Sequence, residues 1–101
     1  MTRNVRLNME GCIIEIRAGE GGDDAKSLVM EQFAIYVRRC ERSGWRVEVA
    51  DQRPGILVAR LLGSGVEDAF KDEAGGHRWQ RVPPNERHGR VHTSTVTVAV
   101  L

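Results

Sequence analysis

The segment from residue 77 to residue 94, HRWQRVPPNERHGRVHTS, concentrates side chains that could do chemistry. It contains all three histidines of the chain, four arginines and two of the three prolines. Four kinds of role suit such a segment: a metal site, a catalytic histidine cluster, a surface that binds nucleic acid, or a solvated connecting loop. The spacing and the neighbours of these residues help to separate the four.

The histidine spacing gives little support for a metal site or a catalytic centre. His88 and His92 are four residues apart, a spacing that can bind zinc from one face of a helix. Gly89 and the β-branched residues that follow it indicate a strand instead. Thr93 stands beside His92, but neighbouring side chains of a strand point to opposite faces, which separates nucleophile from base. We therefore predict no metal ligand, catalytic residue or cofactor, and stoichiometric zinc in a metal analysis would revive the enzyme hypothesis.

The composition of the segment suits single-stranded RNA better. Unpaired bases are recognised by stacking on aromatic, histidine or arginine planes and by hydrogen bonds to their edges, while cations bind phosphates. The Pro83–Pro84 pair stiffens the chain in an extended form and lowers the entropic cost of holding Asn85 in place. The candidate stacking groups are His77, Trp79, His88 and His92. The candidate hydrogen-bonding groups are Gln80, Asn85, Thr93 and Ser94. The candidate cations are Arg78, Arg81, Arg87 and Arg90. A connecting loop with a core tryptophan and solvated arginines is the competing interpretation.

The glycine-rich turn GEGG at 19–22 is a second candidate site. The backbone N–H groups of a turn between a strand and a helix can bind phosphate. The Lys and Ser/Thr of a phosphate loop are missing, however, and Glu20, Asp23 and Asp24 would repel a phosphate. The turn is therefore either a tight connection with acids at a helix N-terminus, or a site that presents N–H groups and a carboxylate to a neutral ligand such as a base edge.

Length and composition limit the remaining possibilities. With 101 residues and 41% hydrophobic content, the chain has room for one small domain over 1–101. The net charge of +1 argues against a basic arm or an acidic tail. Cys12 and Cys40 lack metal spacing and are expected to be buried thiols in a reducing compartment. Because there is no long apolar run and no signal-peptide pattern, we predict a cytoplasmic location.

Strands are expected in four segments where β-branched residues are dense or alternate with polar ones. These segments are residues 12–17, 45–51, 56–62 and 90–101. The second and third form an antiparallel hairpin, because a Pro-Gly turn joins them. The last segment is apolar up to Leu101, which suggests that the chain was cut from a longer one.

A long helix is expected over 25–44, with one apolar stripe and Gly44 as its stop. A short helix is expected within 63–76, capped by Ser64 and with Val66, Ala69 and Phe70 toward the core. The order β-α-β-β-α-β predicts an α+β fold. We expect a two-layer sandwich of one mostly antiparallel sheet with both helices on one face.

Three stretches resemble the codon-recognition domain of bacterial class I peptide chain release factors. They are IEIRAGEGGDDA (14–25), the Gly-Trp join at 44–45 and GGHRWQRVPPNERHGRVHTSTVTVAV (75–100). The similarity is closer to the type that reads UAA and UAG than to the UGA-reading type. It implies a module that recognises an mRNA stop codon in the decoding centre of the small ribosomal subunit, without a membrane or a small-molecule substrate.

The resemblance also implies roles for individual residues. The tip of the family's first helix contributes a glycine and a glutamate to uracil recognition, and the matching residues are Gly21 and Asp24, which is one methylene shorter. The histidine that stacks against the bases matches His92. The residues that contact the third base match Gln80 and Thr93. Together these matches predict a site for bases.

The chain departs from the family at a tripeptide, Pro-x-Thr, which matches Pro83, Pro84 and Asn85. An asparagine can still donate and accept, and it suits an adenine edge. Its longer side chain and its missing methyl group change the usual geometry. We therefore predict altered or weakened discrimination of stop codons.

The release reaction itself is not expected of this chain. Release factors hydrolyse peptidyl-tRNA with a Gly-Gly-Gln loop on a separate domain, and no Gly-Gly-Gln occurs in this sequence. Arg81, Arg87 and Arg90 are expected to contact phosphates. Two hypotheses follow: a stop-codon recognition module of a release factor or its homologue, or a stand-alone ribosome- or RNA-binding module that has lost decoding. Asp24 and Asn85 favour the second somewhat.

Overall fold

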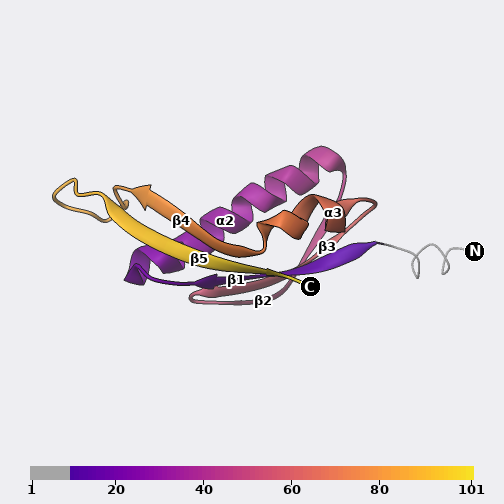
Figure 1. The fold of residues 1–101 in the computed structure, drawn as a ribbon, viewed down its shortest axis with the longest axis horizontal. Helices are drawn as coiled ribbons and strands as arrows, with labels where there is room; N and C mark the ends of the chain where they lie inside the picture. Colours follow the sequence, from indigo (N-terminus) through magenta and orange to yellow (C-terminus); the bar gives the residue numbers. More distant parts are fainter. Residues whose placement is uncertain (1–9) are drawn as a thin grey trace, which may run out of the picture.

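A computed structural model, which describes residues 10–101, shows an α+β domain of two layers (Figure 1). One layer is a five-stranded sheet of order β2-β3-β1-β5-β4, and each neighbouring pair is antiparallel. The other layer holds the helices on one face of the sheet, as predicted. The elements are β1 (Gly11–Ala18), α2 (Gly22–Ser43), β2 (Arg46–Arg53), β3 (Ile56–Leu62), α3 (Val66–Phe70), the 3-10 turn η1 (Lys71–Glu73), β4 (Gly75–Arg81) and β5 (His92–Val100).

The core lies between the central strands and α2. Successive side chains of a strand alternate between faces, so every second residue of β1 and β3, such as Ile14, Ile16 and Leu57, is fully buried against the helix. The apolar stripe predicted for the long helix is confirmed, with Val37 only partly buried. Its buried members include Val29, Phe33, Tyr36 and Cys40.

Two smaller predictions about the core are also confirmed. Gly44 ends α2 in a left-handed conformation (φ 73), and the following Trp45 N–H donates to the Cys40 carbonyl oxygen at 2.9 Å. Cys12 and Cys40 are buried free thiols, and burial raises the pKa of both.

No helix in the described part of the chain is long and apolar enough to cross a membrane.

The short helix differs from its prediction. It occupies only Val66–Phe70. The cap position is Gly65 (φ 83), so Ser64 does not cap the helix. Val66 and Phe70 are buried as expected, but Ala69 is exposed. A helix of five residues presents its two end positions, four apart, to the core, and the three residues between them face water.

Residues 75–81, interpreted from the sequence as the end of the short-helix segment (63–76) and the start of the following loop, form strand β4. This strand pairs with β5 from Gly75 opposite Val98 to Arg81 opposite His92. The last strand accordingly begins at His92 and not at residue 90. Two glycines followed by charged and polar residues give β4 little intrinsic strand propensity, so its pairing with β5 determines its conformation.

Candidate nucleic-acid interface

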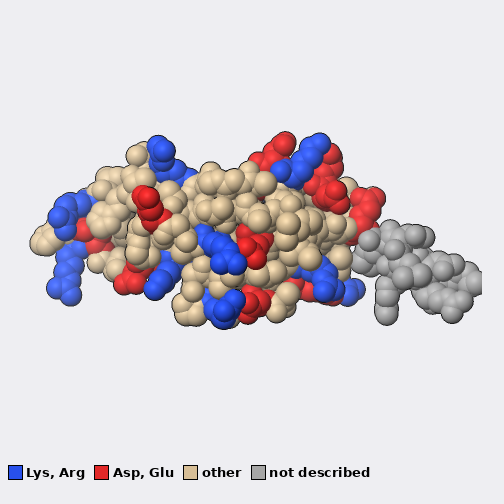
Figure 2. All heavy atoms as spheres, turned by 60° about the horizontal axis from the view of Figure 1, so that its bottom comes forward, with Lys and Arg blue, Asp and Glu red and all other residues tan. Residues whose placement is uncertain are grey.

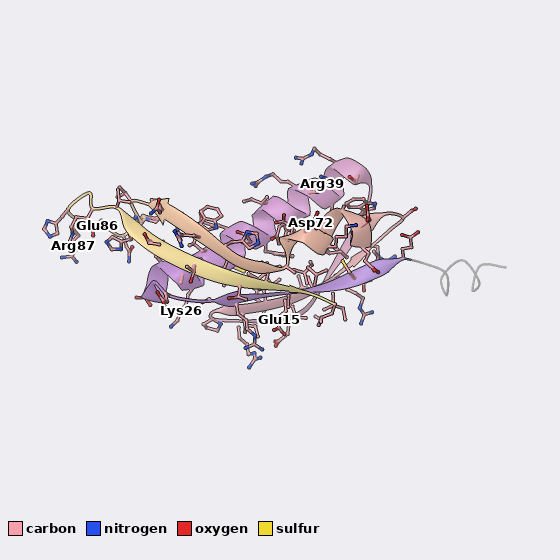
Figure 3. The ribbon with its side chains drawn as sticks, in the orientation of Figure 1. Glu15, Lys26, Arg39, Asp72, Glu86 and Arg87 are labelled. Atoms are coloured by element: carbon pink, nitrogen blue, oxygen red, sulfur yellow. The ribbon has the colours of Figure 1, made fainter. Side chains whose placement is uncertain are left out.

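Most of the residues with predicted RNA-binding roles gather at one end of the domain, whereas His77 and Trp79 contact η1 and the middle of α2. This end holds the N-terminus of α2 and the 82–91 loop, which joins β4 to β5 (Figure 1). Lys26, near the start of α2, and Glu86 and Arg87, in the loop, mark this end among the side chains (Figure 3). Segments separated by 50 to 70 residues in the sequence therefore meet here.

The glycine-rich turn before α2 is fastened to β5. The Gly19 N–H donates to the Thr95 carbonyl oxygen, the Thr95 N–H donates to the Glu20 carbonyl oxygen, and the Glu20 N–H donates to Thr95 Oγ1, each at 2.8 Å. Gly21 has φ 119, and a Cβ atom there would lie 2.4 Å from Ser94 Oγ. The turn therefore requires a glycine at position 21 for conformation and for close packing on β5.

The pairing of β4 with β5 brings the two residues assigned to the third base together. Gln80 lies directly opposite Thr93, with Gln80 Nε2 3.5 Å from Thr93 Oγ1. Both side chains are exposed. They lie on the face of the β4–β5 ribbon that points away from α2, because Trp79 and Arg81, their alternating neighbours, contact the helix.

Asp24 and Arg81 bind each other on the opposite face of the ribbon. Arg81 Nη2 donates to Asp24 Oδ1 at 2.6 Å, Arg81 Nη1 donates to Glu31 Oε1 at 2.8 Å, and Ser94 Oγ donates to Asp24 Oδ2 at 2.8 Å. The side chain of Asp24 is 4% exposed and that of Arg81 is 21% exposed. The guanidinium beside it holds the pKa of Asp24 below its usual range. The contacts with RNA predicted for these two residues would require this cluster to open.

Trp79 and His77 make hydrogen bonds within the domain, and these contacts hold both rings in the fold instead of leaving them free to stack on bases. Trp79 Nε1 donates to Gln32 Oε1 at 3.0 Å, Gln32 Nε2 donates to the Tyr36 hydroxyl at 2.8 Å, and that hydroxyl donates to Glu73 Oε1 at 2.9 Å. His77 Nε2 lies 2.7 Å from the Glu73 carbonyl oxygen. Burial raises the pKa of Tyr36. This chain of hydrogen bonds joins β4 and η1 to α2.

Glu86 organises the loop between β4 and β5. Its carboxylate accepts the His88 N–H, lies 3.1 Å from His92 Nε2 and 3.7 Å from Arg90 Nε, and is 5% exposed. The Glu86 N–H donates to the Pro83 carbonyl oxygen at 3.0 Å. The His88 N–H in particular holds the pKa of Glu86 below its usual range. No sequence motif pointed to a role for Glu86, although it is the only acid between residues 76 and 101.

The remaining candidates line the outside of the loop. Pro84, Asn85 and Arg87 are exposed, whereas Pro83 is buried. Figure 2 shows Lys and Arg atoms standing out at this end of the molecule. Among residues 10–101, no group of three or more His, Cys, Asp and Glu residues is arranged to hold a metal ion. The exposed cations and amides suit an extended, negatively charged ligand.

Comparisons with known proteins agree with the resemblance drawn from the motifs. The family model of the PCRF domain matches residues 3–98. Peptide chain release factor 1 of Nitrosomonas europaea is 49% identical over 94 residues, which cover 87% of this chain and 26% of the relative. Peptide chain release factor 1 of Anaeromyxobacter dehalogenans is 50% identical over 95 residues, which cover 88% of this chain and 26% of the relative.

A solved structure gives the same result. The chain described as RF2 of Thermus thermophilus has a TM-score of 0.80 and 35% sequence identity, with 91% of this chain and 28% of that chain covered. The chain thus spans about a quarter of the length of the relatives that it matches. Because the family model covers nearly the whole sequence and the fold superposes as well, the chain belongs to the PCRF domain family, whose relatives here are peptide chain release factors.

Proposed function

We propose that this chain is the stop-codon recognition module of a peptide chain release factor, or of a release-factor homologue, acting in translation termination. The observation that carries the proposal is the convergence of three distant segments at one end of the domain. These are the 19–22 turn fastened to β5, the exposed Gln80–Thr93 pair, and the 82–91 loop organised by Glu86. The names of the relatives support the same assignment.

The chemistry of the exposed groups fits the edge of a base. The resemblance assigns Gln80 and Thr93 to the third base of the codon, which is a purine in UAA and UAG. Each of these side chains can donate and accept, and a side-chain amide can pair with the N6–H and N7 of adenine. A base that left these groups without partners would cost about 1–3 kcal/mol for each desolvated group.

The proposed partners are the decoding centre of the small ribosomal subunit and the mRNA stop codon, and the proposed location is the cytoplasm. The exposed Arg87 and Arg90 would supply affinity for phosphates that does not depend on the codon. We also propose that the chain does not hydrolyse peptidyl-tRNA by itself, because its sequence lacks Gly-Gly-Gln. A release assay with the isolated chain tests this, and any peptide release would contradict it.

Binding to programmed ribosomes tests the proposed function. The labelled chain is titrated against ribosomes that carry UAA, UAG, UGA or a sense codon in the decoding site, and we expect the tightest binding with UAA and UAG. Because the resemblance assigns Gln80 and Thr93 to the third base, the double variant Gln80→Ala, Thr93→Ala should lose the preference for UAA over a sense codon that differs only at that base, such as UAC. Lys71→Ala serves as the control. Equal binding of the unmodified chain to every codon would contradict the proposal.

Equal binding to every codon would instead support a stand-alone ribosome- or RNA-binding module that has lost decoding. The observation in its favour is Asn85, an exposed residue where the family has threonine. A chimera of the Nitrosomonas europaea relative that carries residues 75–94 of this chain isolates the effect. We expect altered release at UAA or UAG, restored by Asn85→Thr, and unchanged termination would show that Asn85 has no such effect.

A further inference from the structure

We propose that Arg81 is a positioning residue, which clamps the β4–β5 ribbon to α2 by bridging Asp24 and Glu31, and that it does not contact phosphate. The proposal rests on the proposed function and refines it. It replaces the phosphate contact expected for Arg81 from its place in a basic segment.

The geometry of the cluster is that of a clamp. Asp24 and Glu31 are seven residues apart, about two turns along one face of α2, so a single planar guanidinium can reach both. The two terminal nitrogens of Arg81 divide between them, one to each carboxylate, at 2.6 and 2.8 Å. The guanidinium carbon also lies 5.8 Å from the centroid of the Trp79 ring. Arg81 is therefore held on three sides.

The position of Arg81 in the chain gives the clamp its effect. It is the last residue of β4, so the clamp acts where the ribbon ends and the loop begins. Gln80 precedes it and points to the opposite face, toward Thr93. Fixing the side chain of Arg81 on α2 therefore fixes the orientation of Gln80 relative to the glycine-rich turn, which Ser94 and Thr95 hold on the same helix end.

Burial and charge both disfavour a phosphate at Arg81. Two carboxylates already balance its charge, and the hydrogen bonds that the guanidinium donates to Glu31 and Asp24 raise the pKa of Arg81. Its Nε is buried and has no hydrogen-bond partner within the described part of the chain. A phosphate would have to displace Asp24 or Glu31, or join them as a third anion. Displacement would leave a carboxylate without its partner, and a third anion would be repelled by the other two. Arg87, exposed on the loop, has no such constraint.

Two variants separate positioning from phosphate binding. Glu31→Ala removes one anchor of the clamp, although loss of an acid should by itself strengthen binding to RNA. Arg81→Lys keeps the charge but cannot reach both carboxylates with a planar fork. We expect each variant to lower the preference for UAA over a sense codon about tenfold, within the range that one base contact contributes. The dependence of affinity on salt should stay unchanged.

Two controls match these variants. Asp23→Ala makes the same charge change as Glu31→Ala on an exposed neighbour of Asp24, and the codon preference should remain. Arg87→Ala removes an expected phosphate contact and should lower the slope of log affinity against log salt by about 0.7 to 0.9 with the codon preference intact. If Arg81→Lys behaves as the unmodified chain, and Arg81→Ala lowers the salt slope as Arg87→Ala does, Arg81 is a phosphate contact and the proposal is overturned.

Amide hydrogen exchange tests the clamp independently of decoding. In Glu31→Ala and Arg81→Lys, the amides of residues 80–93 should exchange faster, while those of β1 and β3 keep their protection. If the unmodified chain binds all codons equally, the proposed function fails, but the exchange result still decides whether Arg81 positions the ribbon. Unchanged exchange in both variants would overturn the clamp whatever the ribosome experiment shows.

Discussion

Two surfaces of α2 are attached to the sheet in different ways. Along most of its length the helix packs on β1 and β3 through apolar side chains such as Leu28, Ile16 and Leu61, all fully buried. Where it faces β4, the contacts are hydrogen bonds and ion pairs, from Trp79 to Gln32 and from Arg81 to the helix carboxylates. Apolar packing is strong and tolerates small rotations, whereas hydrogen bonds are weaker but directional.

This difference separates stability from orientation. The apolar region supplies most of the free energy of folding, since burial of a large aliphatic side chain contributes about 1.5–3 kcal/mol. The polar region adds less to stability, but it sets the angle at which the β4–β5 ribbon leaves the helix. Four changes test this separation, and they are ordered by the size of the expected effect on stability.

Leu57→Ala should have the largest effect. Leu57 is fully buried in β3, and its truncation leaves a cavity that costs about 2–5 kcal/mol. Urea unfolding measures the loss, with Leu57→Met as a volume-conserving control that costs less than about 1.5 kcal/mol. Codon preference per folded molecule should not change. A loss of preference in fully folded Leu57→Ala would break the separation between the two regions.

Asp24→Asn should have the second largest effect, about 1–3 kcal/mol at neutral pH, because it weakens a buried pair that Arg81 shares with Glu31. The pKa of Asp24 is lowered in the folded chain, so its stabilisation is complete above the ordinary aspartate value of 3.8 and is lost as the pH falls through the lower folded value. The difference in unfolding free energy between chain and variant should therefore shrink in acid. A difference that is constant from pH 7 to pH 2 would contradict this assignment.

Trp79→Phe should cost about 0.5–1.5 kcal/mol, because it removes the indole donor and leaves Gln32 Oε1 without this hydrogen bond. A double-mutant cycle with Gln32→Leu isolates the hydrogen bond from the loss of ring area. We expect a coupling energy above about 0.5 kcal/mol. Additive effects would mean that the ribbon is held here by packing, as the rest of the sheet is.

Arg17→Ala should have the smallest effect. Its pair with Glu15, at 2.7 Å, lies on the sheet face away from α2, and its side chain is 59% exposed. Exposed pairs of this kind contribute little because water and salt screen them. Thermal unfolding should show no measurable change. A large change would show that ion pairs stabilise this domain wherever they occur, and the contrast with Arg81 would lose its meaning.

Local patterns predicted the elements that make the core. The helix stripe through Val29, Phe33 and Cys40 and the β-branched run in β5 are periodic signals that each element carries within itself. Strand β4 has no such signal, since Gly75 and Gly76 disfavour a strand, and it forms only by pairing with β5. The extent of the sheet at that edge could not be read from local sequence.

The residue types of the candidate site could be read from the sequence, but the contacts among them could not. The clustering of cations and amides around Pro83 and Pro84 predicts an RNA-binding loop without any knowledge of the fold, and RNA binding stays a prediction. The partners of Arg81 are 57 and 50 residues away, and no local pattern links them. Gln32 was missed for the same reason, although a glutamine four residues before Tyr36 on the helix is a signal that it lies on the buried face.

The position of β5 in the sheet has a consequence for the order in which the molecule can form. This strand follows the other described elements of the domain in sequence, yet it lies inside the sheet and pairs with both β1 and β4. During synthesis, α2 and the β1–β3 pairing can form early, and one edge of β1 then stays unpaired until β5 is available. The end of the domain proposed to read bases, built from Glu20 with Thr95 and Asp24 with Ser94, cannot form until residues 92–100 have left the ribosome. Within this domain, the proposed decoding surface therefore forms after the pairing of β1 with β3.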